Sequence, residues 1–111
     1  MDSLTRSFSA LADPTRRAIL GRLVAGSATF TELAAPFEIS KPAVVKHLRA
    51  LESAGMIARD GTKARPIYRI VPGGLALPRD WVAHQARLWD ETFDRLDAYV
   101  RTITEAEGGT A

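Results

Sequence analysis

Apolar residues recur at helical spacing in several short segments of the chain, and residues that start or end helices bound these segments. Residues 3–11 repeat apolar side chains four and then three positions apart, which predicts a short amphipathic helix. Its apolar residues are Leu4, Phe8 and Leu11. The pair Asp13-Pro14 predicts the start of a second helix, because aspartate caps free amides and proline fits a first turn. Thr29 and Glu32 have the spacing of a capping box, which predicts a third, short helix.

The segment from Ser40 to Gly55 predicts a capped amphipathic helix with a basic outer face. Ser40 suits an N-cap, and Gly55 suits the left-handed residue that follows a helix. At 100° per residue, three apolar side chains share one side, and Lys46 and Arg49 fall opposite them. The three are Val44, Leu48 and Leu51. The short helix, a turn and this helix together predict a helix-turn-helix unit, whose basic face is suited to a polyanion such as DNA.

The outer face of this helix carries the residues that we expect to contact a duplex. Lys46 and Arg49 can reach guanine acceptors or phosphates, and Val45, which the helical wheel places towards the exposed face, can meet a thymine methyl. His47 lies at the border of the buried stripe, so a DNA contact and a structural role are both open. For an isolated helix, solvated surface cations would be the simpler interpretation. The candidate DNA-binding residues, with two from the following hairpin, are Ser40, Lys41, Pro42, Val45, Lys46, His47, Arg49, Lys63 and Arg65.

A basic β-hairpin is expected directly after this helix. Residues 56–59 and 67–71 have the composition of strands, and Asp60-Gly61 begins the turn between them. Lys63 and Arg65 stand at its tip, with Arg59 and Arg69 on its flanks. A two-stranded hairpin after a helix-turn-helix unit predicts a wing. The expected fold class is mainly α, a winged helix-turn-helix of about five helices and a two-stranded wing.

The last part of the chain predicts a long helix over residues 79–104 with a coiled-coil seam. Its apolar residues alternate at spacings of four and three over three heptads, which is typical of a dimer interface. The candidate interface residues, including those of the first helix, are Leu4, Phe8, Leu11, Val82, Trp89, Phe93, Leu96 and Val100. The aromatic residues could instead line a pocket for a small-molecule inducer. Residues 105–111 are expected to form a disordered tail.

Charge is distributed unevenly along the 111 residues, although the net charge is only +2. Residues 1–78 carry eleven Lys and Arg against six Asp and Glu, whereas residues 79–111 carry four against seven. This asymmetry favours a basic binding body joined to a helix with another task. The chain has no cysteine, which excludes disulfides and thiolate metal sites. It also has no apolar run of membrane-spanning length and no signal-like leader, so we expect a cytoplasmic protein without a membrane partner.

Several segments closely resemble the ArsR-type winged-helix transcriptional regulators. The resemblance covers about residues 4–71 and rests on Asp13-Pro14-Thr15-Arg16-Arg17-Ala18-Ile19-Leu20, Glu32-Leu33-Ala34, Ser40 to Val44, Lys46-His47-Leu48 and Leu51 to Ile57. It implies homodimeric repressors of palindromic operators that dimerise through the first and last helices, with the wing tip at the neighbouring minor groove or backbone. Members that sense soft metals carry a cysteine pair where residues 29–33 stand here, so this chain resembles a branch without that motif. A serine is common in the family where Val45 stands, so base preference does not carry over.

Metal binding, catalysis and protein binding are the alternatives to this interpretation. Asp80 and His84 lie four apart and acidic residues follow, but closed zinc sites need four ligands, so a solvated acidic face is the better interpretation and no metal or cofactor is expected. No cysteine nucleophile, phosphate-binding glycine loop or nucleophile elbow is present, so no enzyme activity is expected. A winged-helix module that binds only proteins would not need the basic helix and hairpin. We therefore expect a single domain over residues 1–104 that binds double-stranded DNA. Within it, the helix-turn-helix unit and wing are expected at 13–71 and the dimerisation helix at 79–104.

Overall fold

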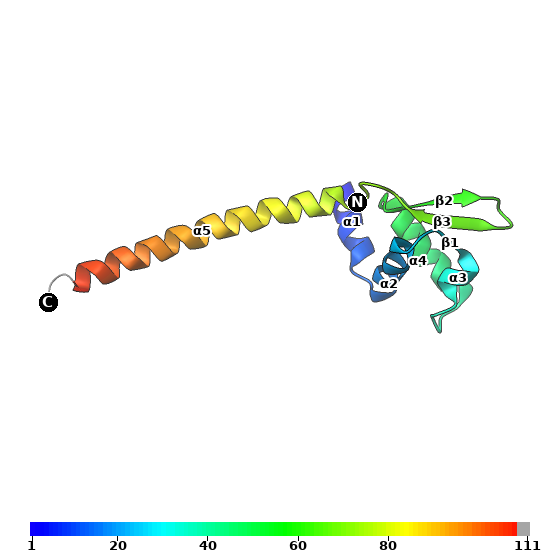
Figure 1. The fold of residues 1–111 in the computed structure, drawn as a ribbon, viewed down its shortest axis with the longest axis horizontal. Coiled ribbons are helices and arrows are strands. Elements are labelled where there is room, and N and C mark those ends of the chain that lie inside the picture. The colour runs from blue at the N-terminus through cyan, green and yellow to red at the C-terminus, as the bar shows by residue number, and fades with distance from the viewer. Residues whose placement is uncertain (109–111) are drawn as a thin grey trace. The chain divides into compact units, whose positions relative to one another are not determined.

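The structure, a computed structural model, describes residues 1–108, which form five helices and three strands (Figure 1). In chain order these are α1 (Ser3–Leu11), α2 (Pro14–Val24), β1 (Ala28–Thr29), α3 (Phe30–Ala34), α4 (Lys41–Ser53), β2 (Ile57–Gly61), β3 (Pro66–Ile70) and α5 (Ala76–Gly108). The chain divides into two compact units, the first from Met1 to Pro78 and the second from Arg79 onward. The expected winged helix-turn-helix fold, mainly α with a small sheet, is confirmed.

Side chains cap the first four helices, which explains where each of them begins. Each capping oxygen accepts a hydrogen bond from the amide three residues later, at 2.7 to 3.3 Å. The caps are Asp2, Asp13, Thr29 and Ser40. Glu32 also accepts from the Thr29 amide at 3.2 Å, which completes the predicted capping box. The sequence predicted the last three caps but not Asp2.

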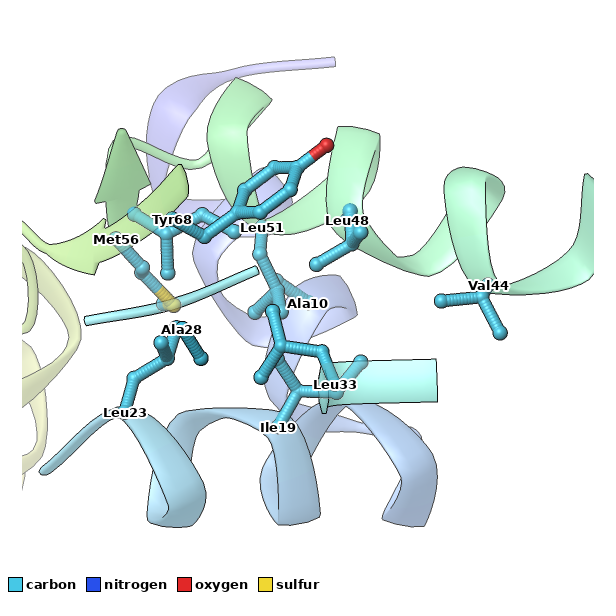
Figure 2. Close-up of a cluster of buried hydrophobic side chains, with 11 residues drawn as sticks. Ala10, Ile19, Leu23, Ala28, Leu33, Val44, Leu48, Leu51, Met56 and Tyr68 are labelled. Carbon is cyan, nitrogen blue, oxygen red and sulfur yellow. The ribbon is translucent and has the colours of Figure 1, made fainter. Parts of the chain in front are cut away.

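The core of the first unit forms where α1, α2, α3 and α4 meet one face of the sheet. Figure 2 shows the side chains of α2 and α4 meeting from opposite sides, with Met56 and Tyr68 contributed from the sheet region. The predicted inner stripe of α4 is confirmed, because its three apolar residues are at most 1% exposed. The buried apolar residues are Ala10, Ile19, Leu23, Ala28, Leu33, Val44, Leu48, Leu51, Met56, Ile57 and Tyr68. Non-directional packing of this kind holds α4 against the body and leaves its other side outward.

The sheet contains a strand that the sequence did not predict. Its order is β1-β3-β2, with both pairs antiparallel, and β2 and β3 are the two strands of the expected wing. In the β1–β3 pair, Ala28 lies opposite Tyr68 and Thr29 lies opposite Ile67. Thr29 therefore pairs with β3 through its backbone while its side chain caps α3. This strand joins the helix-turn-helix unit to the wing.

Helix α5 is longer than the sequence predicted at both ends. It begins at Ala76, so that Pro78 lies within its first turn, where the missing amide hydrogen has no intrahelical partner to lose. It continues to Gly108, so residues 105–108 of the predicted disordered tail lie in the helix, while 109–111 lie outside the described residues. No helix in the described part of the chain combines the length and the apolar character needed to cross a membrane.

Candidate nucleic-acid interface

The outer face of α4 forms a shallow basic depression. Its lining is made by Lys41, Pro42, Val45, Lys46 and Arg49, which are five of the residues predicted to contact DNA. Four of them are exposed. Val45 is half-buried, so its side chain is less exposed than the sequence predicted. Its remaining apolar surface lies among cations. Ser40 lies at the start of this face, but its hydroxyl is occupied in capping α4, at 3.3 Å from the Ala43 amide.

The wing projects its own cations from a tight turn. Gly61 ends β2 with a φ of +81°, and a Cβ added there would lie 2.5 Å from the carbonyl oxygen of Arg65. Only glycine fits this backbone without strain. Lys63 and Arg65 follow in the loop and are exposed, as predicted. A depression of about 500 Å³ separates this loop from the start of α3, and both Arg65 and Glu32 line it.

The fifteen lysines and arginines fall into two groups according to whether their side chains have a partner within the protein. Nine arginines donate to a carbonyl, a carboxylate, a hydroxyl or a histidine ring, or form an ion pair: Arg6, Arg16, Arg17, Arg22, Arg69, Arg79, Arg87, Arg95 and Arg101. Across residues 1–108, the other six side chains have no hydrogen bond or ion pair. These six are Lys41, Lys46, Arg49, Arg59, Lys63 and Arg65, and all lie on α4 or the wing. Within residues 1–108, the cationic side chains that make no such contact are therefore confined to these two elements.

The division of the cations into partnered and unpartnered side chains changes which wing residues are candidates for a DNA contact. Arg69, expected as a basic flank, donates from Nε to Asp60 Oδ2 at 2.6 Å, so that its charge is neutralised. Arg59 was absent from the candidate binding residues, although it is exposed and lies opposite Tyr68 in the β2–β3 register. Alternation along β2 could not have identified it, because Arg59 shares a strand face with the buried Ile57 and lies opposite the buried Tyr68.

His47 lies at the edge of the basic face and contacts α2. Its Nδ1 accepts a hydrogen bond from Arg16 Nε at 3.1 Å and lies 3.8 Å from Asp13 Oδ2. Its side chain is 17% exposed. Of the two roles left open by the sequence, these contacts favour a structural one. Desolvation raises the pKa of Asp13, but the Arg16 amide and the neighbouring His47 and Arg16 hold it below its usual value overall.

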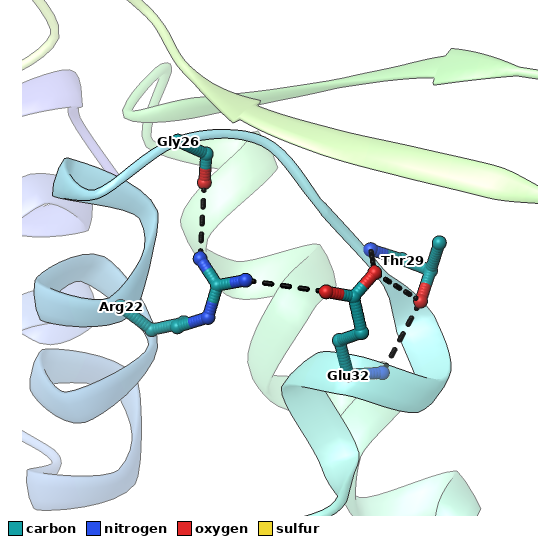
Figure 3. A network of polar contacts seen from close by, with 4 residues as sticks. All are labelled: Arg22, Gly26, Thr29 and Glu32. Carbon is teal, nitrogen blue, oxygen red and sulfur yellow. Dashed lines mark hydrogen bonds and ion pairs between the residues drawn. The ribbon is translucent and has the colours of Figure 1, made fainter.

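A polar network fixes α3, the first helix of the helix-turn-helix unit (Figure 3). Arg22 of α2 donates to the Gly26 carbonyl and to Glu32 Oε2, both at 3.2 Å. The other carboxylate oxygen of Glu32 accepts from the amide and the hydroxyl of Thr29. These hydrogen bonds from Thr29, followed by the Arg22 charge, lower the pKa of Glu32.

The candidate dimer residues divide between packed and exposed positions. Leu11 packs against the core of its own chain, and Leu4 and Phe8 are half-buried. The five candidates on α5 are 50–64% exposed. They are Val82, Trp89, Phe93, Leu96 and Val100.

The histidine and acidic residues of α5 are not gathered into a metal site. His84 Nδ1 faces Arg87 at 3.5 Å, and Asp80 pairs with Arg79 at 3.1 Å. Within residues 1–108, no three His, Cys, Asp or Glu side chains are placed to share an ion.

Comparison with known proteins agrees with the fold. A helix-turn-helix domain family matches residues 11–60. The HTH-type transcriptional regulator Rv2034 of Mycobacterium tuberculosis is 42% identical over 74 residues, covering 67% of this chain and 69% of the relative. The transcriptional repressor SdpR of Bacillus subtilis is 44% identical over 61 residues, covering 55% and 67%. A crystal structure of an ArsR family transcriptional regulator superposes with a TM-score of 0.75 at 41% identity, covering 79% of this chain and 91% of the other. The chain belongs to the ArsR family of winged helix-turn-helix, DNA-binding transcriptional regulators.

Proposed function

We propose that this protein is a homodimeric repressor that binds a palindromic operator through α4 and the wing. The observation that carries the proposal is the confinement of all six unpartnered cations of residues 1–108 to these two elements. An exposed charge without a protein partner is free to displace a counterion from a phosphate, and that release is a main source of DNA affinity.

Helix α4 enters the major groove in this proposal. Its outer depression combines Lys46 and Arg49, which can reach guanine acceptors or phosphates, with the half-buried methyl groups of Val45. Lys41 and Pro42 lie in the first turn, where the Lys41 charge and the positive end of the helix dipole both favour a phosphate. Base preference therefore depends on Val45, Lys46 and Arg49.

In this proposal the wing contacts the DNA backbone next to the major groove that α4 enters. Arg59, Lys63 and Arg65 are exposed on a hairpin whose turn is fixed by Gly61. Their task is to position the protein on the duplex rather than to select bases.

Two copies associate through apolar surface that includes the seam of α5. Large apolar side chains at heptad spacing, each at least half exposed in one chain, are suited to burial against a second copy. Two-fold symmetry then presents two recognition helices about 34 Å apart, one DNA turn, so the operator is an inverted repeat. Repression follows when the bound dimer excludes the transcription machinery, and the relative SdpR is named a transcriptional repressor.

The deciding experiment is selection of duplexes from a genomic or random pool, followed by gel-shift titration of variants on the selected duplex. We expect an imperfect palindrome and a loss of binding of more than tenfold in the K46A/R49A variant, because each base contact is worth about 1–3 kcal/mol. The R95A/R101A variant is the matched control, because it removes two charges from α5 away from the seam. Equal binding by wild type and K46A/R49A would refute the assignment of α4. A wild-type protein that selects no duplex would favour a protein-binding module instead.

A further inference from the structure

Arg16 connects three helices of the first unit. Its Nε donates to His47 Nδ1 on α4 at 3.1 Å, and its Nη1 donates to the Ser9 carbonyl in the last turn of α1 at 3.0 Å. Its own backbone amide donates to the α2 cap, Asp13 Oδ2, at 3.1 Å. The orientation of α4 is thus tied to the end of α1 through one side chain.

The chemistry of arginine determines the state of the histidine ring. A guanidinium donates hydrogen bonds and cannot accept them, so Nδ1 of His47 must be the acceptor. A neutral ring that accepts at Nδ1 carries its proton on Nε2. Asp13, at 3.8 Å from the same Nδ1, is beyond hydrogen-bond distance and acts on the ring only through its charge.

The Arg16–His47 hydrogen bond depends on direction, whereas the rest of the α4 interface is apolar packing that has no preferred direction. The inner side of α4 is held by Val44, Leu48 and Leu51, whose apolar packing tolerates small rotations about the helix axis. A hydrogen bond has a preferred angle and distance, so the Arg16–His47 contact restricts such rotations. His47 is adjacent to Lys46 and two residues before Arg49, so any rotation at His47 moves both reading side chains.

We propose that Arg16 and His47 are positioning residues that set the rotation of the recognition helix, and that His47 acts as an acceptor towards Arg16 rather than as a DNA contact. The inference rests on the proposed function of α4. It also assigns a purpose to Arg16, which the charge pattern alone would group with the DNA-binding cations.

Two amide variants of His47 separate the positioning role from a DNA contact. In H47N the side-chain oxygen can take the place of Nδ1 and accept from Arg16, whereas in H47Q the amide takes the place of Nε2. Both variants are neutral and polar. We expect H47N to bind the selected duplex within about twofold of wild type and H47Q to bind about tenfold more weakly, the change that corresponds to one hydrogen bond to a charged group.

The R16A variant completes the test. R16A should weaken DNA binding at least as much as H47Q, because it also removes the hydrogen bond to the Ser9 carbonyl. Combining R16A with H47Q should cost little more than R16A alone, because both changes remove the Arg16–His47 contact. Tight binding by H47Q with loss in H47N would identify His47 as a DNA contact and overturn the proposal. Equal binding by the two variants, whether strong or weak, would also overturn it, since an acceptor at the Nδ1 position would then make no difference.

A measurement without DNA keeps this inference separate from the proposed function. Nitrogen-15 chemical shifts of the imidazole in the free protein should show Nδ1 unprotonated and Nε2 protonated at pH 8, and R16A should shift the ring towards a mixture of tautomers. A ring already mixed in the wild type would refute the Arg16–His47 contact even if operator binding were confirmed. If the expected tautomer were found but the wild type selected no duplex, the contact would stand and both DNA-binding proposals would fall.

Discussion

Arg69 and Asp60 are joined across the wing by a hydrogen-bonded ion pair of 2.6 Å, Arg69 Nε donating to Asp60 Oδ2. Both side chains are about half exposed, at 46% and 53%, so the pair contributes little to stability. Its main consequence is electrostatic. It removes one cation from the surface that the wing offers to a phosphate backbone.

Releasing Arg69 should strengthen DNA binding without changing specificity. The D60N variant removes the carboxylate charge and leaves the Arg69 charge uncompensated, so affinity for every duplex should rise by roughly twofold to tenfold with a steeper salt dependence. The D97N variant is the control, because it frees Arg101 from a similar ion pair on α5 with the same change of net charge. Equal gains in the two variants would mean that total charge, rather than the position of Arg69, is responsible.

Neutralising the tip of the wing should weaken all DNA sequences alike. In the K63A/R65A variant, the slope of log affinity against log salt should become shallower by roughly one for each phosphate that the wing no longer neutralises, summed over both copies. Titrations of the operator and of a scrambled duplex at several salt concentrations would measure this. A loss restricted to one base position of the operator would show that the wing reads sequence.

The seam of α5 should control the oligomeric state. Phe93 is 64% exposed in the single chain, and the F93D variant would place a carboxylate where apolar burial is expected. Because burying an unpaired charge is costly, F93D should be monomeric or partly unfolded when examined by analytical ultracentrifugation and circular dichroism. The D94N variant changes the neighbouring position off the seam and should remain dimeric. A folded F93D dimer would place the interface elsewhere.

The protein should lose stability in acid partly through its helix caps. The pKa of Asp2 is lowered, chiefly by the Thr5 amide, and the pKa values of Asp13 and Glu32 are also lowered overall. A carboxyl with a lowered folded-state pKa stabilises the fold above its unfolded pKa, near pH 4, and loses that contribution as pH falls through the folded-state value.

The D13N variant provides the test of this pH dependence. Asparagine still caps the helix but does not titrate over this range, so the difference in unfolding free energy between wild type and D13N should shrink as pH falls from about 6 to about 3. Urea unfolding across that range would measure it. A difference that stayed constant with pH would assign the effect to cap geometry rather than to charge.

Local patterns in the sequence were sufficient to predict the helices and the basic outer face of α4. The caps at Asp13, Thr29 and Ser40 and the buried stripe of α4 follow from interactions within three or four residues. Periodicity therefore predicted both the fold class and the side of α4 that carries Lys46 and Arg49. The same local information placed the end of α5 near residue 104, whereas a polar, glycine-containing segment continues the helix to Gly108.

Only the tertiary structure decided which charges are available and what His47 contacts. Arg16 and His47 are 31 residues apart, and Asp60 and Arg69 meet only because β2 and β3 pair in one register. The two-residue strand β1 likewise exists only through its pairing with β3. In the sequence, Thr29 is already explained as the cap of α3, so no local pattern indicates a strand there. The sequence by itself determined the elements and the excess of positive charge, because both depend on composition and short-range spacing. The division of that charge into paired and unpaired groups depends on contacts between distant segments, which only the folded chain brings together.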